Sequence, residues 1–173
     1  MTLEELRADF ALQVYRWLHR GVRSFSEMSD QSKAFRQKLS ERYYIAAAEI
    51  EQRLVSKLDG TAKYLLRLPD GEHVECVLME YHHGYSICIS SQVGCKMNCS
   101  FCATGKSGFS RNLTASEMLS QIQTVQQDQG IRISNVVLMG MGEPLDNYQN
   151  VLRFLELVSS DEGMNIGMRH ISL

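Results

Sequence analysis

The sequence predicts an α/β fold in which a small helical unit precedes alternating strands and helices, and three observations support this. Apolar residues recur at helical spacing over roughly the first 50 residues. From residue 62 they alternate with polar residues, as in strands that bury one face. The second half of the chain then follows the order strand, helix, strand, helix, strand, which is typical of right-handed βαβ units in a parallel sheet or barrel.

The length and composition are those of one ordinary folded domain, or of a small domain with part of a larger one. The 173 residues carry a formal net charge of −2 and include only two prolines, so the composition excludes a disordered or collagen-like chain. No apolar run is long enough to span a membrane, and Met1 leads directly into a helical pattern instead of a secretion signal. We therefore expect a cytoplasmic protein that makes no membrane contact.

The N-terminal unit is expected to contain two amphipathic helices. Thr2 and Glu5 form a capping box for the first helix, whose apolar stripe ends at a glycine. Ser29 or Asp30 begins the second helix, which covers about residues 31–44. Together these helices form the predicted N-terminal unit.

A β-hairpin is expected next. Strands over residues 64–68 and 73–79 flank the segment 69–71, whose proline and glycine fit a tight turn. Side chains alternate between the two faces of a strand, so Glu75 and Cys76 are expected to point in opposite directions.

Another strand, over residues 85–90, leads directly into a cysteine-rich loop. Its odd-numbered residues are apolar, and its even-numbered residues are Ser86, Cys88 and Ser90, which share the opposite face. A lone cysteine in a strand is ordinarily a small buried hydrophobic residue. The two neighbouring hydroxyl groups weaken that interpretation for Cys88.

The remaining elements complete the βαβ order. Thr114 and Glu117 form a capping box for a helix that ends at Gly130. A nearly all-apolar strand follows over residues 133–139, which suits a sheet that is buried on both faces. The last two predicted elements are a helix and a strand, over residues 147–159 and 169–173.

Two groups of positive charge bear on nucleic-acid binding. Arg16, Arg20 and Arg23 gather where the first helix ends, although a short basic patch is more often a solvated face than an RNA contact. Between Glu80 and Glu117 the chain contains no other acidic residue. This gap predicts a positive local field suited to phosphate groups. The basic residues and histidines within it are His82, His83, Lys96, Lys106 and Arg111.

Three of the five cysteines form a C-x3-C-x2-C run of Cys95, Cys99 and Cys102. An odd count with this clustering does not suit a disulfide framework and indicates a metal site in a reducing compartment. Structural zinc normally uses two C-x2-C pairs or a Cys2His2 set, and only the last two of these cysteines have such spacing. An iron–sulfur cluster held by three cysteines would leave one iron open to a substrate or cofactor. A reactive iron–sulfur site and a structural zinc or cysteine-rich loop are therefore the two interpretations.

The segment Gly140-Met-Gly-Glu-Pro144 follows the strand of residues 133–139, at the end where α/β sheets bind ligands. Its glycines would let a ligand approach the backbone, and Glu143 offers a carboxylate to an ammonium group. The segment is not a dinucleotide fingerprint, because the third glycine is missing and Pro144 interrupts it. Taken alone, it is equally an ordinary strand-to-helix turn.

These motifs resemble those of a known superfamily. The cysteine run, with Phe101 before its third cysteine, resembles the motif of the radical S-adenosylmethionine (SAM) enzymes. The Gly-Glu-Pro of residues 142–144 resembles the segment that contacts the SAM amino group in those enzymes. Longer stretches resemble the RlmN/Cfr group, which are radical SAM methyltransferases acting on adenine in RNA. These stretches are SSQVGC, FCATGKSGFSRNLT, MGMGEPLDNY, GMRHISL and, in the N-terminal unit, WLHRGVRSFSEM.

The resemblance implies a fold and a division into domains. Residues 1–55 would form a helical accessory RNA-binding domain, and residues 56–80 a connecting β-hairpin. Residues 81–173 would form the first βαβαβ part of a radical SAM partial (β/α)6 barrel, and would thus be a truncated core.

The resemblance also implies a [4Fe–4S] cluster and SAM as cofactors. The cluster ligands would be Cys95, Cys99 and Cys102. The residues that contact SAM would be Phe101, Gly142, Glu143 and Pro144. Cys88, seven residues before the first cluster cysteine, matches the second catalytic cysteine, which helps to resolve a covalent enzyme–RNA adduct. Glu75 matches the carboxylate that contacts the adenine and handles its proton, whereas Cys76 matches no family role that we can assign.

The implied reaction is methylation of adenine C2 in 23S ribosomal RNA, at the peptidyl transferase centre, and in transfer RNA, next to the anticodon. The Glu-Pro after Gly142 is the pattern of this branch, whereas the branch that methylates C8 and confers antibiotic resistance has alanine after the glutamate. The implied partners are the two RNAs and an electron donor such as flavodoxin or ferredoxin, and the full-length protein would be a monomer. In the family the methyl-carrying cysteine comes after the position of Leu173, so we expect this chain to be an N-terminal portion without turnover. The alternatives are a non-catalytic iron–sulfur or zinc RNA-binding module and the C8 branch.

Overall fold

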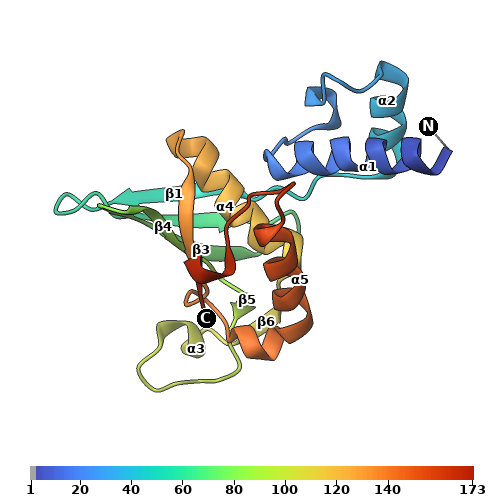
Figure 1. Cartoon of the computed structure of the whole chain (residues 1–173). Coiled ribbons are helices and arrows are strands. Elements are labelled where there is room, and N and C mark those ends of the chain that lie inside the picture. The colour runs from blue at the N-terminus through green and yellow to red at the C-terminus, as the bar shows by residue number, and fades with distance from the viewer. Residues whose placement is uncertain (1–2) are drawn as a thin grey trace.

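The computed structural model describes the chain from Leu3 to Leu173, with side chains described from Asp9 onward. Figure 1 shows a helical unit at one end, an extended segment that leaves it, and a twisted sheet with helices packed against one face. The capping box expected at Thr2 and Glu5 lies outside the described residues and side chains. None of the described helices is long and apolar enough to cross a membrane.

The N-terminal unit contains the two expected helices, α1 (Leu3–His19) and α2 (Lys33–Arg42), with a short 3-10 turn, η1 (Phe25–Glu27), between them. The predicted start of α2 at Ser29 or Asp30 was wrong. Ser32 is the N-cap, and its hydroxyl accepts a hydrogen bond from the Phe35 amide at 3.2 Å. Asp30 is not free to cap the helix, because its carboxylate accepts a hydrogen bond from the Trp17 indole at 2.6 Å.

The helical unit is fastened to the rest of the protein by side chains of a later helix, α4 (Ala115–Gln129). Gln123 donates to the carbonyl of Leu18 at 2.7 Å, and Gln127 donates to the carbonyl of Gly21 at 2.5 Å. The Leu18 carbonyl also accepts a hydrogen bond from the Gly21 amide at 3.0 Å, so Gln123 adds a second bond there, while Gln127 binds the carbonyl of a residue just after the helix. The α1 end is therefore held against α4.

Two of the three arginines near the end of α1, Arg16 and Arg23, also contact later segments of the chain. Arg16 forms an ion pair of 2.7 Å with Glu162, and Arg23 donates to the carbonyl of Ala48 at 3.2 Å. The Arg20 guanidinium lies 5.0 Å from the centre of the Trp17 ring. Each of these three arginines thus has a partner within the protein, so their clustering does not require an RNA contact.

A mixed six-stranded sheet has the order β1-β2-β3-β4-β7-β8. The predicted hairpin and the predicted parallel strands are confirmed, since β2 pairs with β3 antiparallel and β4, β7 and β8 run parallel. The edge strand β1 was not predicted, and it pairs antiparallel with β2 although it lies within residues 1–55. The division into three domains stays a prediction. The strand bounds are β1 (Glu49–Val55), β2 (Ala62–Arg67), β3 (His73–Tyr81), β4 (Gly84–Cys88), β7 (Ile133–Val137) and β8 (Ile171–Ser172).

Helices α4 and α5 (Tyr148–Ser159) pack on one face of the sheet and bury the main core (Figure 1). The predicted capping box of α4 is confirmed: the Thr114 hydroxyl accepts from the Glu117 amide at 3.3 Å, and the Glu117 carboxylate accepts from the Thr114 amide at 2.8 Å. Gly130 ends the helix with a φ of 64°, a left-handed conformation that favours glycine. A 3-10 turn, η3 (Met168–His170), precedes β8, so the last strand begins two residues later than expected.

Four short elements surround the cysteine-rich loop and were not predicted. A two-stranded antiparallel ribbon closes the base of the loop, and a short helix and a 3-10 turn lie beside it. These elements are β5 (Gln92–Gly94), α3 (Ala103–Lys106), β6 (Phe109–Asn112) and η2 (Pro144–Asn147).

Candidate functional site

The cysteine loop is a hairpin insertion that the β5–β6 ribbon holds at its base. The Cys95 amide donates to the carbonyl of Gly108 at 2.8 Å. Gly94 has a φ of 74°, and a Cβ atom there would lie 2.0 Å from the same carbonyl oxygen. Only glycine fits this position, because it combines a left-handed backbone with close contact between two chain segments. The loop therefore leaves the sheet in a fixed direction.

The three clustered cysteines are all reduced and reachable from solvent. Cys95 and Cys102 are half-buried and Cys99 is exposed. The pKa of Cys102 is lowered, above all by a hydrogen bond from the Gly105 amide, so its thiolate form is favoured. Gly105 lets α3 pack closely on the loop, since a Cβ atom there would lie 3.0 Å from the Asn98 Cα.

The donor chemistry of the loop fits an iron–sulfur cluster, which is held by cysteine thiolates. The structure does not gather the three thiols, however, because no group of three or more Cys, His, Asp or Glu side chains among the described residues is placed to hold a metal ion. The assignment of Cys95, Cys99 and Cys102 as ligands stays a prediction. Phe101, whose side chain is 91% exposed, lies between the last two of them in the sequence.

The turn of residues 140–144 lies directly after β7 and packs onto the segment that joins β4 to β5. A Cβ atom on Gly140 would lie 2.7 Å from the carbonyl oxygen of Ile89. Gly142 has a φ of 99°, and a Cβ atom there would lie 2.6 Å from the Cβ of Gln92. These close contacts within the protein account for both glycines, and the expectation that a ligand also approaches the backbone here stays a prediction.

Glu143 and Pro144 begin the 3-10 turn η2. One Glu143 carboxylate oxygen accepts a hydrogen bond from the Leu145 amide at 2.9 Å, and buried Pro144 occupies the first position of the turn. Among the described residues, the second oxygen of this carboxylate has no hydrogen-bond donor. Half-buried Glu143 can therefore offer an oxygen to a cationic ligand while its orientation is held.

The sequence-based analysis missed the buried polar residues that join the cysteine loop to this turn. The amides of Ser91 and Gln92 both donate to the carbonyl of Met141, at 2.8 and 3.2 Å. The Asn147 side-chain amide donates to the carbonyls of Ser91 and Leu113, at 2.8 and 2.7 Å. The sequence does contain a signal for these residues, since two serines and a glutamine directly follow a buried strand. Polar groups are buried only when they have hydrogen-bond partners, so such a run indicates a buried polar network.

Glu75 and Cys88 lie on the sheet face opposite α4 and α5. In the register of β3 and β4, Val77 pairs with Cys88, so Glu75 is a diagonal neighbour of Cys88 at roughly 7–8 Å. The Glu75 carboxylate forms an ion pair of 2.8 Å with Lys63. Burial raises the pKa of the Cys88 thiol, and the Met139 amide partly offsets that effect.

Cys76 faces the core, on the opposite side of β3 from Glu75, as the alternation of side chains predicted. It is 1% exposed, and burial strongly raises the pKa of its thiol. A buried neutral thiol behaves as a small apolar side chain. Cys76 therefore belongs to the packing of the core, and Cys88 belongs to the open face.

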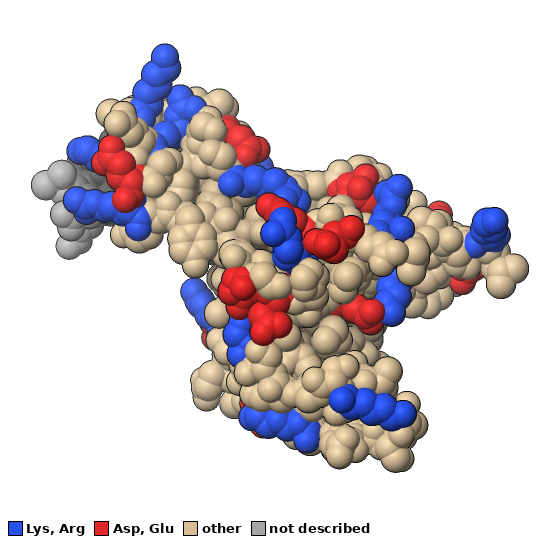
Figure 2. All heavy atoms as spheres, turned by 180° about the vertical axis from the view of Figure 1, so that it is seen from behind, with Lys and Arg blue, Asp and Glu red and all other residues tan. Residues whose placement is uncertain are grey.

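The predicted positive field around the loop was wrong for two of its basic residues. Lys96 forms an ion pair of 3.0 Å with Asp146, and Arg111 pairs with Asp70 at 2.6 Å and with Glu117 at 2.8 Å. These acids lie outside the acid-free interval or at its boundary and reach the loop through the fold. Figure 2 shows positive and negative side chains interspersed over the displayed face, without one extended positive patch.

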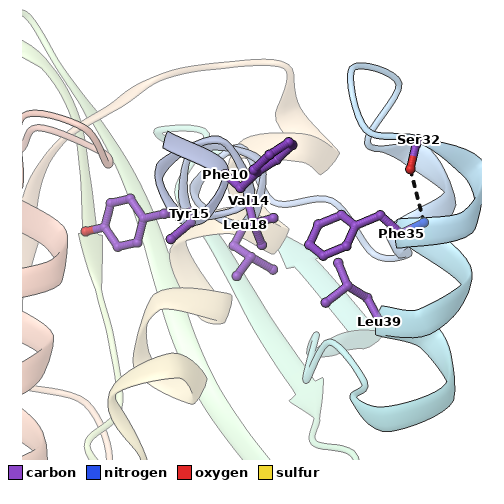
Figure 3. A pocket seen from close by; sticks show the side chains of 8 residues that line it. Phe10, Val14, Tyr15, Leu18, Ser32, Phe35 and Leu39 are labelled. Atoms are coloured by element: carbon purple, nitrogen blue, oxygen red, sulfur yellow. Dashed lines mark hydrogen bonds between the residues drawn. The ribbon is translucent and has the colours of Figure 1, made fainter. Parts of the chain in front are cut away.

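A separate apolar groove of about 660 Å³ lies between α1 and α2 (Figure 3). None of the residues predicted to be catalytic or to bind a cofactor lines this groove. Ser32 lies at one end, with its hydroxyl bonded to the Phe35 amide. The lining residues are Phe10, Ala11, Val14, Tyr15, Leu18, Ser32, Phe35 and Leu39.

Comparison with known proteins identifies two matching family models. The model described as the ribosomal RNA large subunit methyltransferase N-terminal domain matches residues 5–45. The model described as the radical SAM superfamily matches residues 89–173. Over these two regions the chain is similar to the RlmN group of this superfamily. Both expected parts of the family, the N-terminal unit and the start of the radical SAM core, are thus present.

Relatives of this group match nearly the whole chain. The "Probable dual-specificity RNA methyltransferase RlmN" of Lachnoclostridium phytofermentans is 50% identical over 183 residues, covering 100% of this chain and 51% of that protein. The protein of the same name from Clostridium botulinum is 55% identical over 163 residues, covering 94% of this chain and 47% of that protein. The chain therefore spans about half the length of the curated relatives it matches.

A solved structure supports the same assignment at the level of the fold. The crystal structure of a radical SAM methyltransferase from Sphaerobacter thermophilus superposes with a TM-score of 0.86 and 38% sequence identity. The match covers 97% of this chain and 52% of that protein. The predicted α/β fold class, with N-terminal helices and the first part of a radical SAM core, is confirmed.

Proposed function

We propose that this chain forms the N-terminal half of a radical SAM methyltransferase that methylates C2 of adenine in ribosomal RNA and transfer RNA. One observation carries the proposal. The base of the three-cysteine loop and the turn containing Glu143 are joined backbone to backbone, through the bonds from the Ser91 and Gln92 amides to the Met141 carbonyl. A site for a cluster and a site for the cofactor that it activates must be adjacent, and this contact between the two segments supports the proposal.

In the proposed site, Cys95, Cys99 and Cys102 would hold a [4Fe–4S] cluster, and the free oxygen of Glu143 would accept a hydrogen bond from the SAM ammonium group. The exposed Phe101 ring is available to pack against the cofactor. When bound, the cluster and SAM supply radical chemistry, which an aromatic C2–H carbon requires because it is neither acidic nor nucleophilic enough for direct methyl transfer.

Glu75 and Cys88 would act on the RNA base. A base must leave its stack to reach such a site, and the open face of the sheet offers the two side chains side by side. Glu75 would leave its ion pair with Lys63 to contact the adenine and handle its proton. Cys88 would help to resolve the covalent adduct, starting from a protonated thiol, since burial raises its pKa. The proposal includes a small electron-transfer protein such as flavodoxin or ferredoxin as donor, a monomeric full-length enzyme and action in the cytoplasm.

Anaerobic reconstitution of the chain with iron and sulfide tests the cofactor assignment. The expected product is brown, binds about four iron atoms per chain and gives a reduced EPR signal that changes when SAM is added. Serine substitutions at Cys95, Cys99 or Cys102 should abolish the signal, and the matched control Cys76→Ala should retain it, because Cys76 lies in the core. A colourless protein with one zinc per chain would overturn the assignment.

The substrate assignment is tested in cells. Ribosomal and transfer RNA from a strain that lacks the full-length gene should lose 2-methyladenosine when nucleosides are measured by mass spectrometry. Unchanged 2-methyladenosine in both RNAs would refute the proposed reaction, and loss of 8-methyladenosine instead would assign the protein to the C8 branch.

A further inference from the structure

Gln92 is a fully buried polar residue whose side chain joins three segments of the candidate site. Its amide oxygen accepts a hydrogen bond from the Glu143 amide at 2.9 Å. Its amide nitrogen donates to the Asn112 side chain at 2.8 Å and to the Asp146 carboxylate at 2.7 Å. A buried amide left without these bonds would cost about 1–3 kcal/mol, so each partner is effectively required by the fold.

The three partners belong to different parts of the site. Glu143 is in the turn proposed to contact SAM, Asn112 is in the strand that closes the cysteine loop, and Asp146 is in the 3-10 turn that follows. Asp146 also pairs with Lys96, the residue next to Cys95, at 3.0 Å. One side-chain amide therefore connects the loop base and the turn, and its partner extends the connection into the loop.

Packing reinforces these hydrogen bonds. Gly142 lies against the stem of Gln92, because a Cβ atom at that glycine would be 2.6 Å from Gln92 Cβ and 2.8 Å from its Cγ. The Lys96 ammonium group also lies 4.4 Å from the centre of the Phe109 ring, on the strand that closes the loop. A shift of the turn thus requires a shift of Gln92, and a shift of Gln92 disturbs Asn112 and Asp146.

We propose that Gln92 is a positioning residue that fixes the separation between the cysteine loop and the Gly140–Pro144 turn. The inference rests on the proposed function, in which these two segments hold the cluster and SAM. Groups that must meet in a reaction are sensitive to displacements of about 1 Å, and a bond network of this kind restrains such displacements. Gln92 touches neither cofactor in the proposal and acts through Glu143 and Asp146.

The test compares two buried glutamines. Gln92→Glu keeps the size of the side chain and the acceptor for the Glu143 amide, but it places a second oxygen against the Asp146 carboxylate. Gln121→Glu is the matched control, because Gln121 is equally buried and its side chain bonds only the backbone of Ser90, at 2.9 Å in both directions. The combination of Gln92→Glu with Asp146→Asn restores a donor opposite the new oxygen and keeps the charge of the pair.

The first readout is hydrogen exchange of the chain without any metal, followed by mass spectrometry. Peptides covering residues 95–108 and 140–146 should exchange at least about tenfold faster in Gln92→Glu and return to within about threefold of wild type in the double variant. The control should not accelerate these two segments selectively. Equal behaviour of the two single variants, or no rescue, would overturn the proposal.

The second readout uses the reconstituted chain. Gln92→Glu should retain the iron content of wild type but need at least about tenfold more SAM to change the EPR signal, and the double variant should recover the response. If Gln92→Glu does not fold, Asp146→Ala replaces it, since it removes the acceptor of both Gln92 and Lys96 at a partly exposed position. An unchanged SAM response and unchanged exchange in that variant would equally refute the role. Failure of wild type to bind iron would refute the proposed function alone, because the exchange experiment needs no metal.

Discussion

Replacing Gly140 with alanine should destabilise the fold at the candidate site itself. The added Cβ atom would lie 2.7 Å from the carbonyl oxygen of Ile89, 2.8 Å from its carbonyl carbon and 2.9 Å from the Ser90 nitrogen. All three are backbone atoms at the end of a buried strand, so no flexible side chain can move aside. The β4–β5 segment and the turn after β7 would have to separate.

The size of the effect follows from these contacts. Forcing a methyl group into a close-packed interior costs about 1–3 kcal/mol, and three backbone contacts place Gly140→Ala in the upper half of that range, at about 2–3 kcal/mol. For a chain of this length each kcal/mol lowers Tm by about 2–4 °C, so Tm should fall by about 4–12 °C.

Urea unfolding followed by far-UV circular dichroism measures this loss, and Gly167→Ala is the matched control. Gly167 has a φ of −62°, and the nearest atom to an added Cβ is the His170 Cδ2 at 4.0 Å. The control should be neutral or more stable by up to about 1 kcal/mol, because alanine restricts the unfolded chain more than glycine does. A Gly140→Ala midpoint equal to that of the control would refute the close contact between turn and strand end.

Three further outcomes are expected. Arg111→Met should cost about 2 kcal/mol, because it leaves the nearly buried Glu117 carboxylate without its main partner. Burial is the largest single influence on the pKa of Glu117 and raises it, but the hydrogen bonds from Arg111 and the Thr114 amide together lower the pKa below its ordinary 4.5. The stability from this group is thus complete above about pH 4.5 and is lost as the pH falls through the folded-state pKa, so the deficit of the variant in urea unfolding should shrink in acid. Burial lowers the pKa of His19 below its ordinary 6.5. Stability should therefore decrease as the pH falls below that ordinary value toward the lower folded-state pKa, and His19→Gln should remove this contribution in urea titrations. Cys76→Ser should lower stability by about 1–3 kcal/mol in thermal unfolding, because it buries a hydroxyl in the core. Cys88→Ser should lower stability by less than about 1 kcal/mol, because Cys88 lies outside the core. Equal losses would contradict the assignment of the two cysteines to opposite faces of the sheet.

Elements governed by near neighbours in the chain were predictable. The bounds of α4 follow from a capping box of two residues and from a glycine in the left-handed conformation. The faces of β4 follow from simple alternation, and the register with β3 places Cys88 on the open side as expected. The strand β1 escaped prediction because it is an edge strand with all seven residues exposed, so no buried face imposes a hydrophobic pattern on it.

Prediction failed where a side chain bonds to a residue far away in the sequence and not in the role that its neighbours suggested. Asp30 would cap a helix by its position, but Trp17 binds its carboxylate and the cap moves to Ser32. Lys96 and Arg111 lie in an acid-free stretch, but the fold brings Asp146, Asp70 and Glu117 to them. The local electrostatic field therefore cannot be inferred from charges along the sequence until the ion pairs of the folded protein are known.

The sequence by itself predicted the family resemblance, the order of the main helices and central strands, and the candidates for the proposed chemistry, since spacing and residue type suffice for a motif. Only the tertiary structure decided what holds those motifs together. Gln92 is one amide among many in the sequence, and it acquires a role because β6 and the turn after β7 place polar groups within hydrogen-bond distance of its side chain. A buried hydrogen bond depends on the position of both partners, and that position is set by packing of the whole sheet and its helices, not by any local stretch of chain.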